Sequence, residues 1–284
     1  MSAPPRWVSP RSRRGAGSRL QLAGATTLVT GASGGLGSAI ASALRDRGAE
    51  LIVSGRRADE LKSLAASLQA RAVVADLTAR QELERLGTIA LGAGVDVLVA
   101  NAALPASGLL SDLTAAEIDR MLEVNLRAPI MLAHELAPAM VARGRGHLVF
   151  VSSLSGKAAS PASSIYSATK FGLRGFALAL RQDLAPHGVG VSLVSPGFIR
   201  DAGMFADTGV KLPPGTGTKT SADVAAAVIR AIETGRAELE VAPASLRAGA
   251  VFASLAPQLA ASASRLAGSA RVSAELAQRQ RHKR

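Results

Sequence analysis

The sequence contains no cysteine, so it can form neither a disulfide framework nor a thiolate metal site. The four histidines are scattered, and none lies at metal-ligand spacing from another, so we expect no metal. A long apolar run is also missing. A spanning helix needs roughly 18 to 20 such residues, and the nearest approach, residues 248–264, is mostly Ala and Ser and is interrupted by Pro257. We expect no membrane-spanning helix and a cytoplasmic protein.

Acidic residues are scarcer than basic ones, 21 against 33, which gives a formal net charge of +12. Residues 1–24 carry five arginines and no acid, and residues 244–284 carry seven basic residues and one acidic residue, which leaves about +1 for residues 25–243. A nearly neutral body lacks the basic face typical of nucleic-acid-binding domains. Few aromatic residues accompany the arginines at the ends, so we expect no specific nucleic-acid partner.

Three regions follow from this distribution. Residues 1–23 lack the apolar run of a secretory signal and are interpreted as a basic, disordered leader. Residues 24–243 are long enough for one large domain. Residues 244–284 are interpreted as a basic, partly helical extension whose apolar residues recur at steps of four. That stripe predicts a helix that packs on a partner subunit or makes a peripheral contact with an anionic membrane. Its residues are Val251, Leu255 and Leu259, with Phe252 adjacent.

Short β-branched runs alternate with longer helical patterns through the domain, which is typical of βαβ units and a parallel sheet. The seven candidate strands lie at residues 26–30, 50–55, 72–76, 95–101, 147–153, 190–195 and 238–243. A helical stretch at 115–142 contains Pro129 and Pro138, so we expect a kink or break there. Residues 200–220 are rich in Gly, Pro and Thr and predict a long loop of the kind that often forms a lid.

The first candidate strand runs directly into the glycine-rich segment TGASGGLG at residues 30–37. Gly31, Gly35 and Gly37 let the backbone turn tightly at the start of a helix, where free amides can hold a pyrophosphate. The Gly-x-x-x-Gly-x-Gly spacing is wider than the usual dinucleotide fingerprint. A purely structural turn is the alternative.

The second candidate strand ends in SGRR, residues 54–57. An acidic residue at this place would bind the adenosine ribose and repel a 2′-phosphate, but Gly55 stands there and Arg56 and Arg57 follow. Guanidinium groups suit phosphate, so NADP(H) is favoured over NAD(H). Solvated surface arginines are the alternative.

The single tyrosine, Tyr166, precedes Lys170 by four residues, so both lie on one face of the predicted helix. An ammonium group beside a phenol favours the phenolate, so we expect Lys170 to lower the pKa of Tyr166 toward the working pH. This spacing is common by chance. Ser153, which ends a predicted strand thirteen residues before the tyrosine, adds the context of a ligand-binding sheet edge.

These motifs together resemble the short-chain dehydrogenase/reductase family. The segments TGASGGLG, DVLVANAA, VNL, YSATK and SPGFI occur in the family's order over residues 24–243. The resemblance implies an α/β fold, a Rossmann-like doubly wound seven-stranded parallel sheet of order 3-2-1-4-5-6-7 with helices on both faces. It also implies a homodimer or homotetramer that transfers hydride between a nicotinamide cofactor and the carbonyl or alcohol of a small molecule.

The resemblance assigns roles to individual residues. Tyr166 would be the general acid or base, Lys170 would bind the nicotinamide ribose, Ser153 would polarise the substrate oxygen, and Asn125 would hold a relay water at a helix distortion. Asn125 could instead bridge a helix break, and Asp76 could instead cap the next helix. The implied cofactor-binding residues are Gly31, Ser33, Gly35, Leu36, Gly37, Arg56, Arg57, Asp76, Leu77, Asn101, Tyr166, Lys170, Pro196, Gly197, Ile199 and Asp201.

Two departures from the family pattern stand out. The usual Asn-Asn-Ala-Gly is ANAA at residues 100–103, and Asp201 stands where the family commonly has Thr. We interpret the chain as an NADP(H)-dependent oxidoreductase, with lid residues that suggest an apolar substrate. The alternative is a cofactor-sensing binding protein that acts through its basic termini at a membrane or partner surface. The apolar lid residues are Met204, Phe205, Val210 and Leu212.

Overall fold

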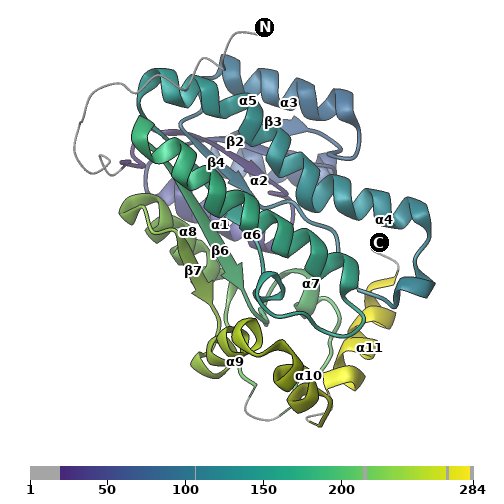
Figure 1. Ribbon diagram of the computed structural model, residues 1–284. Coiled ribbons are helices and arrows are strands. Elements are labelled where there is room, and N and C mark those ends of the chain that lie inside the picture. The colour runs from purple at the N-terminus through teal and green to yellow at the C-terminus, as the bar shows by residue number, and fades with distance from the viewer. Residues whose placement is uncertain (1–19, 106, 214–215, 267–268, 282–284) are drawn as a thin grey trace, which may run out of the picture.

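The computed structural model describes residues 20–105, 107–213, 216–266 and 269–281, so most of the expected leader lies outside the described residues. Within these ranges, seven strands form one parallel sheet in the order β3-β2-β1-β4-β5-β6-β7 (Figure 1). The predicted sheet order is confirmed. The strands are β1 (Thr26–Thr30), β2 (Glu50–Gly55), β3 (Arg71–Val74), β4 (Val97–Ala100), β5 (Gly146–Val151), β6 (Val189–Pro196) and β7 (Glu238–Val241).

Helices cover both faces of the sheet, which explains why its central strands are apolar on both sides. Helices α1 (Gly35–Asp46), α2 (Ala58–Leu68) and α8 (Ser221–Thr234) pack on one face. Helices α3 (Arg80–Gly92), α5 (Ala128–Arg143) and α6 (Ser164–Leu184) pack on the other.

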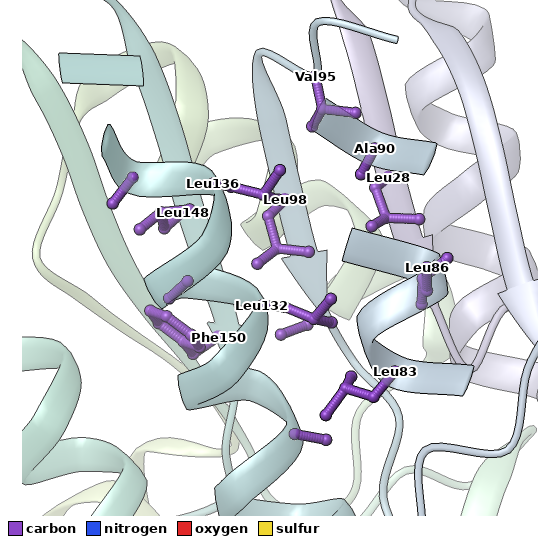
Figure 2. Packing of buried hydrophobic residues seen from close by; sticks show 14 of the residues in the cluster. Leu28, Leu83, Leu86, Ala90, Val95, Leu98, Leu132, Leu136, Leu148 and Phe150 are labelled. Atoms are coloured by element: carbon purple, nitrogen blue, oxygen red, sulfur yellow. The ribbon is translucent and has the colours of Figure 1, made fainter. Parts of the chain in front are cut away.

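Successive side chains along each strand point to opposite faces of the sheet, so the core is divided into two layers. Figure 2 shows the layer beneath α3 and α5, where Leu28 of β1, Leu98 of β4 and Phe150 of β5 meet Leu86 and Leu132 of the helices. All five side chains are buried. The neighbouring strand residues point to the opposite face and pack on α1 and α8. The sheet is therefore held on both sides, and its carboxyl edge provides a fixed base for a site.

The helical stretch after β4 is distorted where the two prolines led us to expect a kink or break. Helix α4 (Ala115–Leu122) continues through a π-helical turn, η2 (Glu123–Arg127), into α5. Pro129 has no amide hydrogen, so the carbonyl of Asn125, four residues earlier, has no α-helical donor. Pro138 lies inside α5 without ending it. The distortion thus centres one turn before Pro129.

The expected loop at 200–220 contains a short helix, α7 (Gly203–Ala206), and its ends are joined by a β-bridge between Ile199 and Lys219. Thr220 then begins α8 with a reciprocal capping box, and Gly235 ends it in the left-handed conformation. Threonine and glycine are residues favoured at the start and the end of a helix, respectively.

Three helices follow β7: α9 (Ala244–Leu255), α10 (Pro257–Leu266) and α11 (Ser269–Gln280). The apolar stripe is divided between two helices, because Pro257 cannot continue the helix that precedes it. Its side chains remain exposed, from 47% for Phe252 to 80% for Leu255. None of the helices that the structure describes is both long and apolar enough to cross a bilayer.

Candidate active site

A cleft of about 990 Å³ lies along the carboxyl edge of the sheet. The loops that follow β1, β2, β3, β4, β5 and β6 all contribute to it, as does the lid around α7. Every site residue implied by the sequence lines this cleft except Asn125 and Lys170. Such an edge, where parallel strands end beside helix N-termini, is where open α/β sheets bind ligands.

The glycine-rich segment brings backbone close to backbone at the start of α1. Gly31 has a φ of +66°, and a Cβ at this position would lie 2.8 Å from the Cα of Ala102. A Cβ on Gly37 would lie only 2.1 Å from the carbonyl oxygen of Gly31. No side chain caps α1, and its first turn holds no acidic residue. The helix N-terminus therefore presents amides and a positive dipole to the cleft, which suits a pyrophosphate.

The two arginines after β2 differ in their surroundings. Arg57 donates to the carbonyl of Ser33 in the glycine-rich segment and lies 3.4 Å from a carboxylate oxygen of Glu60. Arg56 is exposed, lines the cleft, and has no hydrogen-bond or ion-pair partner among the residues that the structure describes. Arg57 thus shapes the loop, whereas the Arg56 guanidinium is available to an anionic ligand.

Asp76 and Asn101 both make contacts inside the protein. The Oδ1 atom of Asp76 accepts hydrogen bonds from the amide and hydroxyl of Thr78, at 3.0 and 2.9 Å, in the turn before α3. The side-chain Nδ2 of Asn101 donates to the carbonyls of Thr30 and Gly31, at 3.1 and 3.3 Å. Asn101 therefore ties the end of β4 to the glycine-rich segment, and Asp76 stabilises a turn while it lines the cleft.

Tyr166 and Ser153 lie together where β5 and β6 end. Both line the cleft, and a hydrogen bond joins their side chains. Ser153 follows β5 in extended conformation, and its hydroxyl accepts a hydrogen bond from the amide of Ser155 at 3.1 Å. Two hydroxyl groups therefore face the space where a substrate oxygen could bind.

Lys170 is 2% exposed, and its Nζ lies 5.6 Å from the centroid of the Tyr166 ring while it donates to the carbonyl of Val151 at 3.2 Å. Burial lowers the pKa of Lys170 to about 8. Burial also raises the pKa of Tyr166, against the opposing effect of its hydrogen bond with Ser153. The net direction is opposite to the one expected from sequence, because desolvation of the phenolate outweighs the hydrogen bond with Ser153.

Asn125 lies in the π-helical turn and is buried. Its Oδ1 accepts from the amide of Leu104 at 2.7 Å, and its Nδ2 donates to the carbonyl of the same residue at 2.9 Å. The side chain thus bridges the distorted helix to the loop after β4, which was the alternative role considered for Asn125. Its backbone carbonyl, which Pro129 leaves without an α-helical donor, could hold a water.

Asp201 lines the cleft and also contacts the start of α8. Its two carboxylate oxygens accept from the amide and the hydroxyl of Ser221, at 2.8 and 3.0 Å, at the start of α8. These hydrogen bonds lower the pKa of Asp201. The carboxylate anchors the lid to α8, and its oxygens keep lone pairs for the cofactor contact that the family resemblance implies.

Several lining residues were not anticipated. Those next to recognised motifs, such as Gly34 and Ala102, could have been found from their neighbours. Arg120 on α4 could not, since no motif marks it and only the packing of α4 brings it to the cleft. The lining residues missed are Gly34, Ser54, Gly55, Ala75, Ala102, Ala103, Leu104, Pro105, Arg120, Val124, Ala202, Gly203 and Asp207.

Comparison with known proteins gives a consistent result. A family model described as short chain dehydrogenase matches residues 25–211. The ketoacyl reductase HetN of Nostoc sp. is 37% identical over 227 residues, which cover 78% of this chain and 79% of that protein. The 3-oxoacyl-[acyl-carrier-protein] reductase FabG of Rickettsia prowazekii is 34% identical over 183 residues, which cover 64% of this chain and 75% of that protein.

Solved structures agree with the relatives found by sequence. A short-chain dehydrogenase from Sphingobium yanoikuyae in complex with NADPH has a TM-score of 0.71 and 28% identity, over 76% of this chain and 87% of that chain. The cleft, the sheet order and these matches lead to one conclusion: the chain belongs to the short-chain dehydrogenase/reductase family of NAD(P)-dependent oxidoreductases.

Proposed function

We propose that the protein is an NADP(H)-dependent oxidoreductase that acts on the carbonyl or alcohol group of an apolar small molecule, with Tyr166 as the general acid or base. The observation that carries this proposal is the single cleft that joins Arg56 and the glycine-rich segment to Tyr166 and Ser153. The complexes of similar proteins with NADPH support the choice of coenzyme.

The bound coenzyme would supply or accept the hydride. The α1 N-terminus and its glycines would hold the pyrophosphate, and Arg56 would hold the 2′-phosphate, with Arg57 supporting the loop. Asp76 and Leu77 would lie beside the adenine, while Asn101 holds the glycine-rich segment through its hydrogen bonds to Thr30 and Gly31. The remaining residues proposed to lie at the nicotinamide end are Pro196, Gly197, Ile199 and Asp201.

The hydroxyl of Tyr166 would donate its proton to the substrate oxygen during reduction, while the Ser153 hydroxyl polarises the same oxygen. Because burial raises the pKa of Tyr166, the phenol is protonated at neutral pH and ready to act as an acid. The reverse reaction needs the phenolate. Reduction takes up a proton and oxidation releases one, so we expect oxidation to improve as the pH rises.

Lys170 and Asn125 would support the proton transfer by Tyr166 from positions outside the cleft lining. The Lys170 ammonium lies against the ring, and its charge favours the phenolate that forms when the proton leaves. The carbonyl of Asn125, which has no α-helical donor, would hold a water that returns the proton from solvent. Neither residue lines the cleft, so both act without direct contact with the carbonyl substrate.

An apolar substrate is supported by the walls of the cleft beyond the phenol. Leu104, Val124, Met204 and Phe205 line it, and the Phe205 ring lies 4.9 Å from that of Phe198. The relatives named ketoacyl and 3-oxoacyl reductases support a carbonyl group as the reacting centre. They do not favour the alternative of a sensing protein that works through its basic ends.

The test is a panel of apolar ketones, aldehydes and alcohols followed by the absorbance of NADPH, with NADH in parallel and Tyr166→Phe as the control. Turnover of at least one carbonyl by the wild type, better with NADPH and lost in the variant, is expected. A wild type that turns over none of them, or a variant that turns them over equally well, would contradict the proposal.

We also propose a cytoplasmic homodimer or homotetramer, with the exposed stripe on α9 and α10 packed against a second copy. Leu255 is 80% exposed and Leu259 is 66% exposed, which is unusual for large apolar side chains left in water. Light scattering of the wild type and of a Leu255→Ser/Leu259→Ser variant tests this proposal. A smaller assembly is expected for the variant. Loss of binding to anionic vesicles without a change in mass would favour the peripheral membrane contact instead.

A further inference from the structure

The last helix returns to the lid that covers the candidate site. Figure 1 shows α9, α10 and α11 in succession at one end of the molecule, with α11 turning back along the side of α7. The term lid here denotes residues 200–213, which contain α7. Two side chains of α11 donate to backbone carbonyls of this lid, although more than 70 residues separate them along the chain.

Both contacts are well formed. The Nη1 of Arg279 lies 3.0 Å from the carbonyl oxygen of Thr208, and the Nε2 of Gln280 lies 3.0 Å from that of Met204. Gln280 is only 6% exposed, and a buried amide is costly unless it is hydrogen-bonded. Glu275 lies 3.0 Å from Arg279 on the same helix and holds its guanidinium in place. Gln280 is therefore held in a buried contact with the lid, and the half-exposed Arg279 adds a second hydrogen bond at the rim of this contact.

The lid depends on such contacts because it has little structure of its own. Helix α7 has four residues, too few to be stable alone. Gly203, the first residue of α7, and Gly209, three residues after its end, have φ of +81° and +64°, a conformation that glycine adopts easily and other residues rarely do. Met204, Phe205 and Asp207 from this segment line the cleft. The position of the substrate wall is therefore set by what packs against the lid from outside.

We infer that α11 is a latch that fixes the substrate wall, with Arg279 and Gln280 as positioning residues. This inference rests on the proposed function of the cleft for its catalytic consequence. Gln280 binds the lid at Met204, which lines the cleft, and Arg279 binds it where α7 has ended. Neither residue lines the cleft, so their loss affects how the apolar part of the substrate is held and not the proton transfer at Tyr166.

Full-length Arg279→Ala, Gln280→Ala and the double variant test the latch. Arg281→Ala is the matched control, because it removes the same charge from the exposed end of the chain beyond α11 and has no bond to the lid. Arg279→Lys restores a donor of similar reach. The first readout needs no substrate: a protease specific for lysine cuts after Lys211, which is exposed in the lid. Cleavage there should be about tenfold faster in the double variant, as expected for two lost hydrogen bonds.

The second readout uses the carbonyl substrate that the panel identifies. We expect KM to rise about tenfold in the double variant with kcat within about twofold, and Arg279→Lys to recover part of the loss. A double variant whose cleavage rate and KM equal those of Arg281→Ala would overturn the latch. A general loss of thermal stability with kcat and KM affected alike would also overturn it. If no carbonyl is turned over, the cleavage rates still decide the latch while the proposed function fails.

Discussion

Replacing Arg56 by alanine tests whether the cleft distinguishes the two coenzymes. Arg56 is the cation at the end of β2 with no partner among the described residues, whereas Arg57 is occupied by Ser33 and Glu60. A hydrogen bond to a charged group contributes about 1.5–3 kcal/mol, and exposure to solvent places this one at the lower end. About 1.4 kcal/mol corresponds to a factor of ten. We therefore expect Arg56→Ala to weaken NADPH binding about tenfold and NADH binding less than about twofold.

Calorimetric titration of both coenzymes measures this directly, since it needs no substrate. Lys62→Ala is the matched control, because it removes one exposed positive charge from α2 at a position that does not line the cleft. NADPH binding to Arg56→Ala should also become less sensitive to salt. Equal weakening of both coenzymes, or an equal effect of Lys62→Ala, would refute the assignment of the 2′-phosphate to Arg56.

Three further changes test other parts of the account. Gly55→Asp should shift kcat/KM toward NADH, because the new carboxylate repels a 2′-phosphate. Its Cβ would lie 2.7 Å from the hydroxyl oxygen of Ser33, so that hydroxyl must move. An unchanged ratio of kcat/KM for NADPH and NADH would contradict this prediction. Gly37→Ala should weaken both coenzymes more than about tenfold in titrations, since its Cβ would meet the Gly31 carbonyl at 2.1 Å. Burial lowers the pKa of His147 from 6.5 to about 4, so the unfolded chain binds a proton that the folded one does not between these values. Stability should therefore fall by about 3 kcal/mol as the pH drops from 6.5 to 4, and denaturant titrations of His147→Gln should show a shallower fall.

Local patterns in the sequence were sufficient to predict the strands of the sheet. Apolar β-branched runs predicted all seven strands, and their order followed from the family resemblance and is confirmed. Helix α8 begins and ends at residues of the kind that favour helix ends, Thr220 and Gly235, because capping depends on residues within a few positions of each other. Pro129 predicted a distortion, and the structure places it one turn earlier because a proline deprives the carbonyl four residues before it.

The contacts that decide chemistry were harder to predict, since they depend on three-dimensional packing. The two hydrogen bonds of Asn125 to Leu104 join residues 21 apart, and no local pattern encodes them. The spacing of Tyr166 and Lys170 placed them on one face, but it gave no measure of burial, and burial reverses the expected direction of the phenol pKa. The bonds from α11 to the lid likewise join distant segments.

The central claim is that the phenol of Tyr166 delivers the proton to the substrate oxygen. The most direct measurement compares single-turnover reduction of a carbonyl substrate by Tyr166→Phe and wild type, with NADPH binding measured on the same samples. We predict that the variant binds NADPH within about threefold of wild type and loses at least about a hundredfold in the rate of reduction, the range that general acid catalysis contributes. A variant that binds NADPH normally and reduces the carbonyl at the rate of wild type would contradict the account.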